Sequence, residues 1–442
     1  MPLVSTKLPL LQGEGWGEDG YTAETAKPIP TLILPLKGRI RPNESGTDPD
    51  YVRKSIIMFE QELEQLQHQN LLRSLMTVDG CTGSRITVNG SSKLLLCSND
   101  YLDLANHPAL KEAACNAMSR YGFGSGASRL ISGTSPLHRD LENRLAQFKG
   151  TESALLFNSG YAANTGIIPA IVDAGDVVLS DELNHASIID GCRMSRASVL
   201  VFRHRDVEHL ETLLGQCRDK RRRLIVTDGV FSMDGDIAPL PVLVDLAERN
   251  DALLMVDDAH AVGVLGRTGR GTAEHFGMDN RIPIQMGTLG KALGSFGAYA
   301  AGRRDLIELL INRARSFMFS TSLPPAVCAA SLAALDIVQR EPERRARLWQ
   351  NRTRFVQDLA TLGISVGASE TPIIPIMIND PRKALDVAAR LFENGVYAIA
   401  VRPPTVPDGS ARIRATVTAA HVENDIDEAL EAFSKLKKEG WL

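Results

Sequence analysis

The sequence lacks the features that mark secreted, membrane-bound and nucleic-acid-binding proteins. Its six cysteines are scattered and include no C-x-x-C pair, which argues against a disulfide framework and against a zinc site. No apolar run is long enough to span a membrane, and no basic segment followed by an apolar stretch is visible at the start. The formal net charge of −4 gives no general electrostatic affinity for nucleic acid or membranes. We therefore expect a cytoplasmic protein that binds neither nucleic acid nor a membrane nor a metal ion.

The 442 residues suffice for two or more domains with a large buried core. Residues 1–50 are rich in Pro, Gly, Thr and Glu, and we expect a disordered tail or an extension outside the catalytic unit. Apolar spacings of three and four then predict a helix from about Asp50 to Met76, within an N-terminal helical segment over residues 51–95. Short apolar runs that alternate with helical patterns predict an α/β domain with a largely parallel sheet over residues 96–330. Residues 331–442 are expected to form a smaller C-terminal domain.

The most informative segment, residues 287–294, sets Lys291 among small, uncharged residues directly after an apolar run. Because burying an ammonium group is costly, such a lysine loses its proton more readily and becomes an amine nucleophile. A carbonyl cofactor such as pyridoxal phosphate needs this kind of amine for a Schiff base. A surface lysine in a glycine-rich turn explains the same residues equally well, so the rest of the chain decides.

Chemically useful side chains follow five strand candidates in series. Ligands of parallel α/β sheets bind beyond the carboxyl ends of the strands, and free N–H groups at a helix start suit a phosphate. Together these segments supply a phosphate cradle, a flat ring to stack on a cofactor, an acid for its ring nitrogen and an amine for its aldehyde. The segments are residues 158–164, 184–187, 231–235, 257–260 and 288–291.

Each of these segments alone also has an ordinary structural explanation. A lone histidine such as His185 is more often structural than catalytic, and an Asp-Asp pair is usually a cap or a turn. Five such segments in series favour a functional explanation. Residues 122–127 fit the dinucleotide pattern G-x-G-x-x-A but follow a helical stretch instead of a strand, so we expect no nicotinamide cofactor. The basic run at residues 220–223 is expected to be a solvated loop.

From about Phe59 to the C-terminus, the chain resembles the α-oxoamine synthase family of fold-type I pyridoxal-phosphate enzymes. The resemblance implies a large pyridoxal-phosphate-binding domain with a mostly parallel seven-stranded sheet, a smaller C-terminal α+β domain, and a homodimer with active sites at the interface. It is carried by the combination of residues 97–102, 124–129, 158–164, 227–235, 256–260 and 287–294.

Residues 294–299 and 401–414 resemble one member of this family in particular. That member, an acyltransferase of biotin biosynthesis, condenses L-alanine with a pimeloyl thioester on CoA or acyl carrier protein and releases CO2 and the free thiol. Sister synthases that join glycine with acetyl-CoA, or serine with a long-chain acyl thioester, stay open because the motifs around the cofactor do not separate them. An aminotransferase of the same fold and a non-catalytic binding protein are further alternatives.

The resemblance also assigns roles to single residues. Lys291 would be the Schiff-base lysine and the general base, Asp257 would pair with the pyridinium nitrogen, and His185 would stack over the ring. Arg414, with its guanidinium fork, would clamp the amino-acid carboxylate. The remaining expected contacts are Gly160, Tyr161 and Thr288 with the phosphate, Ser232 and His260 with the ring hydroxyl, and Asn99, Arg73 and Thr405, together with His185, with the substrate.

Two positions depart from the family pattern, and two others concern a second subunit. Asp103 stands where a glycine usually follows Tyr-Leu, and we expect it to alter a turn near the substrate entrance. Ala261 stands where glycine or serine is common, and we expect it to be tolerated. Ser320 and Thr321 would reach the phosphate bound by a neighbouring subunit.

Overall fold

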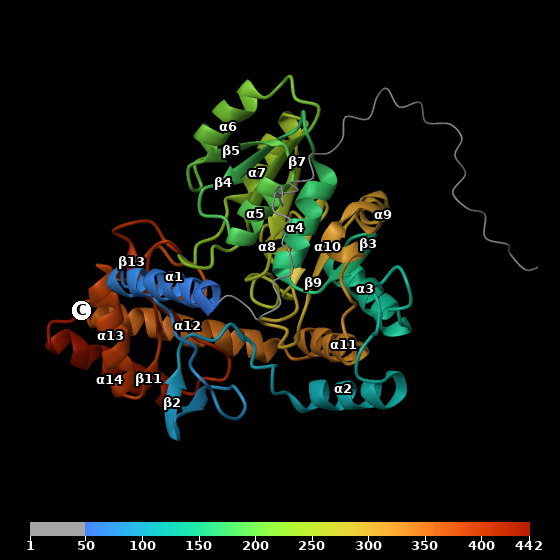
Figure 1. Ribbon diagram of the computed structural model, residues 1–442. Coiled ribbons are helices and arrows are strands. Elements are labelled where there is room, and N and C mark those ends of the chain that lie inside the picture. Colours follow the sequence, from blue (N-terminus) through green and yellow to red (C-terminus); the bar gives the residue numbers. More distant parts are fainter. Residues whose placement is uncertain (1–48) are drawn as a thin grey trace, which may run out of the picture. The chain divides into compact units, whose positions relative to one another are not determined.

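The computed structural model describes residues 49–442, with side chains from residue 59 onward (Figure 1). The tail expected over residues 1–50 therefore lies, apart from its last two residues, outside the described residues. The chain divides into two units between Leu72 and Arg73. In the first unit, helix α1 (Pro49–His68) forms where apolar residues recur three and four apart.

The second unit, residues 73–442, is built around a seven-stranded sheet in which every strand except β9 runs parallel to the others. This confirms the predicted mostly parallel sheet. Strands β4, β8 and β9 are buried along their whole length, and β3, β6 and β7 are buried except for their first residue. In spatial order they are β3 (Ser153–Phe157), β9 (Ala298–Gly302), β8 (Ile284–Thr288), β7 (Leu253–Asp257), β6 (Arg223–Asp228), β4 (Val177–Asp181) and β5 (Ser198–Phe202).

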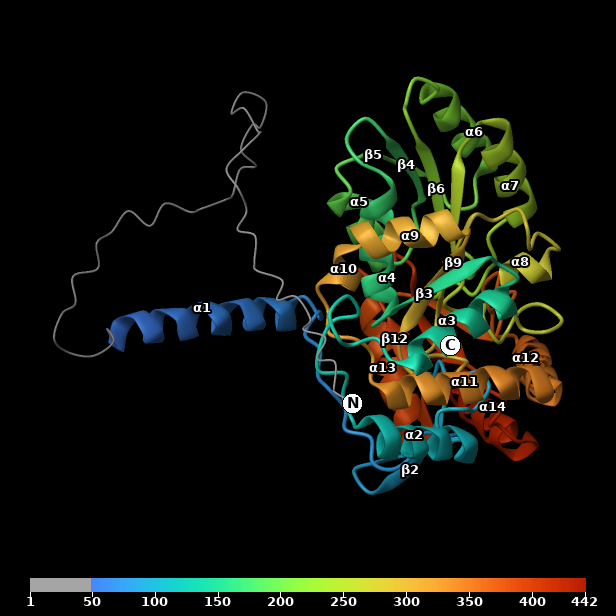
Figure 2. The same ribbon diagram turned by 90° about the vertical axis from the view of Figure 1, so that its right-hand side faces the viewer.

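Helices cover both faces of this sheet, as a parallel sheet requires. Alternate strand residues pack on opposite faces: Val178 belongs to the core beneath α4 and α5, whereas Val177 and Leu179 belong to the core beneath α6 and α7. Figure 2 shows strands of the sheet between these two helix layers. The first layer contains α4 (Gly160–Ile171), α5 (Ala186–Met194), α9 (Arg304–Arg313) and α10 (Arg315–Met318), and the second contains α3 (Pro136–Lys149), α6 (Val207–Gln216), α7 (Leu240–Arg249) and α8 (Thr272–His275).

Helices α2 (Pro108–Tyr121) and α11 (Pro325–Arg340) pack against each other and lead towards the C-terminal part of the chain. There, an antiparallel sheet with the order β10-β13-β12 packs on three helices through a core that includes Phe355, Ile374, Ile413 and Phe433. The elements are α12 (Pro342–Thr361), β10 (Ile373–Asn379), α13 (Pro381–Glu393), β12 (Ile399–Val401), β13 (Ala411–Thr416) and α14 (Glu423–Lys438).

The helix predicted within residues 51–95 extends only as far as His68. Residues 85–95 instead form an antiparallel hairpin of β1 (Arg85–Val88) and β2 (Ser91–Leu95), which β11 (Val396–Tyr397) extends in parallel. The turn residues Asn89 and Gly90 have φ values of 50° and 73°, the left-handed conformations of a type I′ hairpin turn. The hairpin thus packs with the C-terminal elements, while the predicted domain boundaries at residues 95 and 330 stay predictions.

Across residues 49–442, no helix combines the length and the apolar character needed to cross a lipid bilayer. In the same part of the chain, no cluster of three or more His, Cys, Asp or Glu side chains is placed to hold a metal ion. All six cysteines lie apart as free thiols.

Candidate active site

A cavity of about 270 Å³ opens at the carboxyl ends of β4, β6, β7 and β8, where a parallel α/β sheet is expected to bind its ligand. Asp257 is the last residue of β7, Thr288 is the last residue of β8, and Lys291 follows three residues later. The cavity brings together all eight residues that are predicted to contact the cofactor of their own subunit. These lining residues are Gly160, Tyr161, His185, Ser232, Asp257, His260, Thr288 and Lys291.

The start of helix α4 forms one wall of this cavity. Ser159 caps the helix by accepting a 3.1 Å hydrogen bond from the Ala162 N–H. The first N–H groups of a helix have no partner within the helix and favour an anion. A Cβ on Gly160 would lie 2.9 Å from Cγ2 of Thr288, so only glycine lets the helix start approach the end of β8 this closely. The wall therefore has the donors and the space that a phosphate needs.

Asp257 is buried, with 3% of its surface exposed. Its carboxylate accepts hydrogen bonds from Asn164 Nδ2 at 2.8 Å and from the Ala259 N–H at 2.9 Å. Burial raises the pKa of Asp257, although the positive charge of Lys291 and both hydrogen bonds act in the opposite direction. A cation placed beside this carboxylate would relieve the cost of its burial.

Lys291 is held in surroundings that favour the free amine. Burial lowers the pKa of Lys291, while the carboxylates of Asp257 and Asp228 limit the shift. The sequence predicts this direction from the small, uncharged neighbours of the lysine. A lowered pKa increases the fraction of unprotonated amine, which is the form that acts as a nucleophile or as a base.

His185 and His260 are both held neutral. Burial lowers the pKa of His185, and burial with the nearby positive charges lowers that of His260 well below its usual value. Nδ1 of His185 accepts a hydrogen bond from the Ser187 N–H at 3.2 Å. Nδ1 of His260 lies 2.7 Å from the hydroxyl of Tyr101, whose own pKa burial raises, so Tyr101 can donate to it. The Nε2 atom of His260 can then carry the proton.

Apart from His185, which lines the cavity, the residues predicted to contact the substrate fall into two groups outside its lining. Arg414 donates from Nε to the carbonyl of Ser232 at 2.6 Å and from Nη2 to Asn99 Oδ1 at 3.2 Å. Arg73 donates to the hydroxyl of Thr405 at 3.3 Å, at an exposed position. The first group thus adjoins the cavity through Ser232, and the second forms a separate pair. Ser320 and Thr321 are also absent from the lining.

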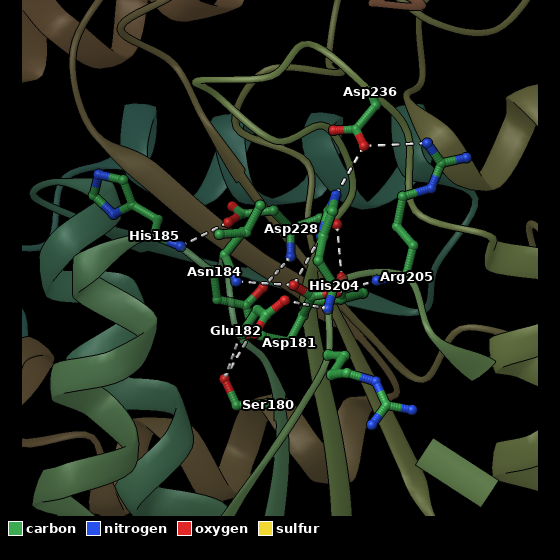
Figure 3. A network of polar contacts seen from close by, with 12 residues as sticks. Ser180, Asp181, Glu182, Asn184, His185, His204, Arg205, Asp228 and Asp236 are labelled. Carbon is green, nitrogen blue, oxygen red and sulfur yellow. Dashed lines mark hydrogen bonds and ion pairs between the residues drawn. The ribbon is translucent and has the colours of Figure 1, made fainter. Parts of the chain in front are cut away.

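Three functional candidates escaped the reading of the sequence. Asn164 Nδ2 donates to Asp257 and, at 2.9 Å, to the hydroxyl of Ser187, whose oxygen lies 2.7 Å from His185 Nδ1. Asp228 ends β6 and accepts the His185 N–H at 2.7 Å (Figure 3). All three lie within segments that the sequence singles out, Asn164 in residues 158–164, Ser187 in residues 184–187 and Asp228 in residues 227–235, but no role was assigned to them.

The two departures from the family pattern fit their positions. Asp103 has a φ of 58°, in the left-handed region that glycine favours and that aspartate adopts more readily than most other residues. The turn conformation that a glycine would take is therefore available to Asp103. Ala261 is fully buried in the core, where a small side chain is required.

A model of the family described as aminotransferase class I and II matches residues 91–433. Among curated proteins, the 8-amino-7-oxononanoate synthase of Geobacter sulfurreducens is 57% identical over 381 residues, which cover 86% of this chain and 97% of that protein. The protein of the same name from Thermoanaerobacter pseudethanolicus is 51% identical, covering 86% of this chain and 96% of its own length.

Two kinds of solved structure have the same fold. A serine palmitoyltransferase from S. paucimobilis, with bound PLP and myriocin, has a TM-score of 0.83 at 30% identity and covers 90% of this chain and 100% of its own. The 8-amino-7-oxononanoate synthase of Francisella tularensis has a TM-score of 0.68 at 31% identity and covers 79% of this chain and 99% of its own. The resemblance to fold-type I pyridoxal-phosphate enzymes is thereby confirmed.

Proposed function

This chain belongs to the aminotransferase class I and II family, and we propose that it acts as a pyridoxal-phosphate-dependent 8-amino-7-oxononanoate synthase. In this reaction L-alanine condenses with a pimeloyl thioester, with loss of CO2 and of the free thiol. One observation carries the chemistry: Lys291, Asp257 and His185 line a single cavity. The choice of substrates is supported by relatives of this name that match over nearly their whole length.

The residues of the cavity fit pyridoxal phosphate group by group. The N–H groups of Gly160 and Tyr161 at the start of α4, with the hydroxyl of Thr288, suit its phosphate. The buried carboxylate of Asp257 suits a protonated ring nitrogen, and the amine of Lys291 suits the aldehyde. When bound, the cofactor supplies an electron sink that stabilises a carbanion on the amino acid.

Two further side chains suit the remaining faces of the ring. His260 and Ser232 line the same cavity and offer a ring nitrogen and a hydroxyl to the cofactor's ring hydroxyl. His185, fixed through Ser187 at the start of α5, supplies a flat neutral ring for stacking. Because burial holds both histidines neutral, neither places a second cation beside the protonated ring nitrogen.

Lys291 and Arg414 divide the handling of the amino acid between them. Arg414 binds the alanine carboxylate through its guanidinium group, which the Ser232 carbonyl and Asn99 hold in place. Lys291 takes the proton from the α-carbon, since its lowered pKa leaves an amine that accepts it. Asp257 keeps the proton on the ring nitrogen of the cofactor, because a carboxylate next to a cation stays ionised. Arg73 and Thr405 contact the thioester substrate.

We also infer a homodimer with the site at its interface. Several large apolar side chains of the second unit are exposed to an extent unusual for an isolated subunit. Phe296 is 56% exposed and lines the cavity, and Ser320 and Thr321 lie next to Phe319. A second copy that covers these side chains would bring Ser320 and Thr321 near its own bound phosphate. Phe123, Leu130, Ile131 and Phe319 are among the other exposed apolar side chains.

A sister synthase is the second candidate, since fold similarity does not favour alanine and pimeloyl thioester. Serine palmitoyltransferase has the higher TM-score, 0.83 against 0.68, at almost the same identity. Sequence identity of 48–57% with curated 8-amino-7-oxononanoate synthases favours the first candidate. The acyl carrier, CoA or acyl carrier protein, and a cytoplasmic location stay predictions.

The test is thiol release from pimeloyl-CoA by the purified, yellow protein, with alanine, glycine or serine supplied separately. Release with alanine alone is expected. Release mainly with glycine or serine would assign the chain to a sister synthase. The control is Lys291→Ala, which should abolish turnover and leave the far-ultraviolet circular dichroism unchanged, because Lys291 contributes chemistry and not core packing. Near-normal turnover in that variant would contradict the mechanism.

A further inference from the structure

His204 follows β5 and is not among the residues that line the cavity, yet it connects two of the loops that do. Its Nδ1 lies 3.0 Å from Oδ1 of Asp181, and its Nε2 lies 2.8 Å from Oδ2 of Asp236 (Figure 3). Carboxylates only accept hydrogen bonds, so both ring nitrogens donate only when the imidazole is protonated. The geometry is therefore that of an imidazolium between two carboxylates.

Other charged groups lie near the same ring: Glu182 after β4, Arg205 after β5 and Glu370 before β10. Glu182 accepts the backbone N–H of His204 at 2.8 Å. Arg205 contacts Asp236 at 3.1 Å and Glu370, from the C-terminal elements, at 3.2 Å. Burial lowers the pKa of His204, but the hydrogen bonds and charges of its carboxylate partners outweigh burial and raise it to about 9. The other charged or titratable side chains nearby on its own segment are Arg203, Asp206 and His209.

One carboxylate partner leads to the loop that carries His185. Asp181 ends β4, and its carboxylate also accepts the N–H groups of Leu183 and Arg205 at 2.9 and 3.0 Å. The Asp181 carbonyl accepts the Asn184 N–H at 3.2 Å, and Asn184 in turn accepts the Asp228 N–H at 2.8 Å. His185 directly follows Asn184 in the sequence, so this series of contacts reaches the loop that carries His185.

The other carboxylate partner leads to the loop that carries Ser232. The carbonyl of Asp236 accepts the Phe231 N–H at 3.0 Å, which closes the loop around Ser232. The ring of Phe231 packs edge-on against His204, with centroids 4.4 Å apart. The carbonyl of Ser232 then receives the guanidinium of Arg414. A displacement at Asp236 would thus reach the group assigned to the alanine carboxylate.

We propose that His204 is a positioning residue, an imidazolium that joins the loop bearing His185 to the loop bearing Ser232 and keeps both in register around the bound cofactor. This inference rests on the proposed function, which assigns His185 and Ser232 to that cofactor. The sign of the pH dependence follows from the raised pKa. Below about pH 9 the protonated His204 ring donates hydrogen bonds to both Asp181 and Asp236. As the pH rises through this value the ring loses a proton and donates to only one of the two carboxylates, so the connection between the loops is lost.

The test compares the holoenzyme with His204→Gln, Asp236→Asn and the exposed control His275→Gln between about pH 6 and pH 10. His204→Gln should lower kcat about tenfold and shift the visible absorbance of the cofactor. In the pH profile of kcat, it should remove the decrease that the wild type shows near pH 9. Asp236→Asn, which keeps an acceptor and removes one charge, should move that decrease down by about one pH unit. His275→Gln should match the wild type.

Nuclear magnetic resonance of the ¹⁵N-labelled imidazoles gives a readout that needs no turnover. One histidine should titrate near pH 9 in the wild type, be missing in His204→Gln and titrate lower in Asp236→Asn. If the kcat, spectrum and pH profile of folded His204→Gln equal those of the wild type, the inference is wrong, even if the variant melts at a lower temperature. If no amino acid supports thiol release, the proposed function fails, while the imidazole titrations and the cofactor spectrum still decide the role of His204.

Discussion

Lys149→Met should destabilise the large sheet domain by about 3–5 kcal/mol, because it leaves a buried carboxylate without its partner. Lys149 Nζ lies 2.9 Å from Asp258 Oδ2, and the two side chains are 0% and 1% exposed. The ammonium group also donates to the carbonyl of Arg270, and the second oxygen of Asp258 accepts from Thr272. Methionine fills a similar volume but removes the charge and every donor.

The magnitude follows from the balance of two large quantities. At 2.9 Å and an effective dielectric constant of about 20, the attraction of Lys149 and Asp258 is about 6 kcal/mol before desolvation. Desolvation of the two ions cancels most of this attraction, so the intact pair adds little. When one ion is removed, the other still pays its desolvation cost but has lost the attraction that offset it. The free energy of unfolding therefore falls by the large amount given above. In Lys149→Met/Asp258→Asn no charge is buried and Thr272 keeps an acceptor, so the loss should be only about 1–2 kcal/mol.

The assay is equilibrium unfolding in denaturant, with the free energy taken from the midpoint at unchanged slope. The penalty of Lys149→Met should shrink from pH 8 to pH 5, where a proton can neutralise the stranded carboxylate. Lys111→Met, at an exposed position on α2, is the matched control and should change the free energy of unfolding by less than about 0.5 kcal/mol. A cost below about 1 kcal/mol for Lys149→Met, or a double variant as unstable as Lys149→Met, would refute the reasoning.

Three further outcomes are expected. Gly160→Ala should weaken cofactor affinity about tenfold or more, because the new Cβ would lie 2.9 Å from Cγ2 of Thr288. Fluorescence titration measures this affinity, and an unchanged value would contradict the prediction. Arg414→Lys should raise the KM for alanine about 10- to 100-fold, since lysine lacks the paired N–H donors of the guanidinium group. Steady-state kinetics measures this KM, and an unaltered value would contradict the prediction. Phe319→Glu should convert the dimer to monomer in sedimentation, because Phe319 is 69% exposed; a persisting dimer would exclude this surface.

The position of the candidate site could be predicted from the sequence because it depends on strand ends alone. In a parallel sheet the carboxyl ends of the strands share one edge, so Asp257 at the end of β7 and Lys291 after β8 are expected to lie near each other. Recognising the strands was enough, since each is a short apolar run bounded by turns. The strand order was not needed for this prediction, and it comes from the structure alone.

The hairpin at residues 85–95 was missed although a local signal exists. Asn89 and Gly90 adopt the two left-handed conformations that a type I′ turn needs, and Asn-Gly is the strongest short sequence signal for such a turn. The helical period of α1 ends near Leu66, and the helical segment expected over residues 51–95 did not take this turn signal into account. The packing of the hairpin against elements near residue 396 could not be predicted, because it joins segments about 300 residues apart.

Contacts between distant polar residues have no local signal at all. Asn164 and Asp257 are 93 positions apart, and Lys149 and Asp258 are 109 apart. Each pair consists of residues that ordinarily seek water, and only the fold shows that one compensates the burial of the other. Sequence patterns therefore predict which groups are candidates for the chemistry, whereas the structure shows which groups hold these candidates in place.

Three carboxylates at the ends of β6 and β7 are each compensated differently, and the difference separates their roles. Asp258 is matched by the buried cation Lys149 and does not line the cavity. Asp228 accepts the His185 N–H, and burial with the charge of Asp257 raises its pKa well above the usual value, which favours its neutral form. Asp257 accepts hydrogen bonds from the neutral donors Asn164 and Ala259, and it lines the cavity together with Lys291. Of the three, Asp257 therefore gains most from a cation in the cavity, and the cost of its burial increases its affinity for a protonated ring nitrogen.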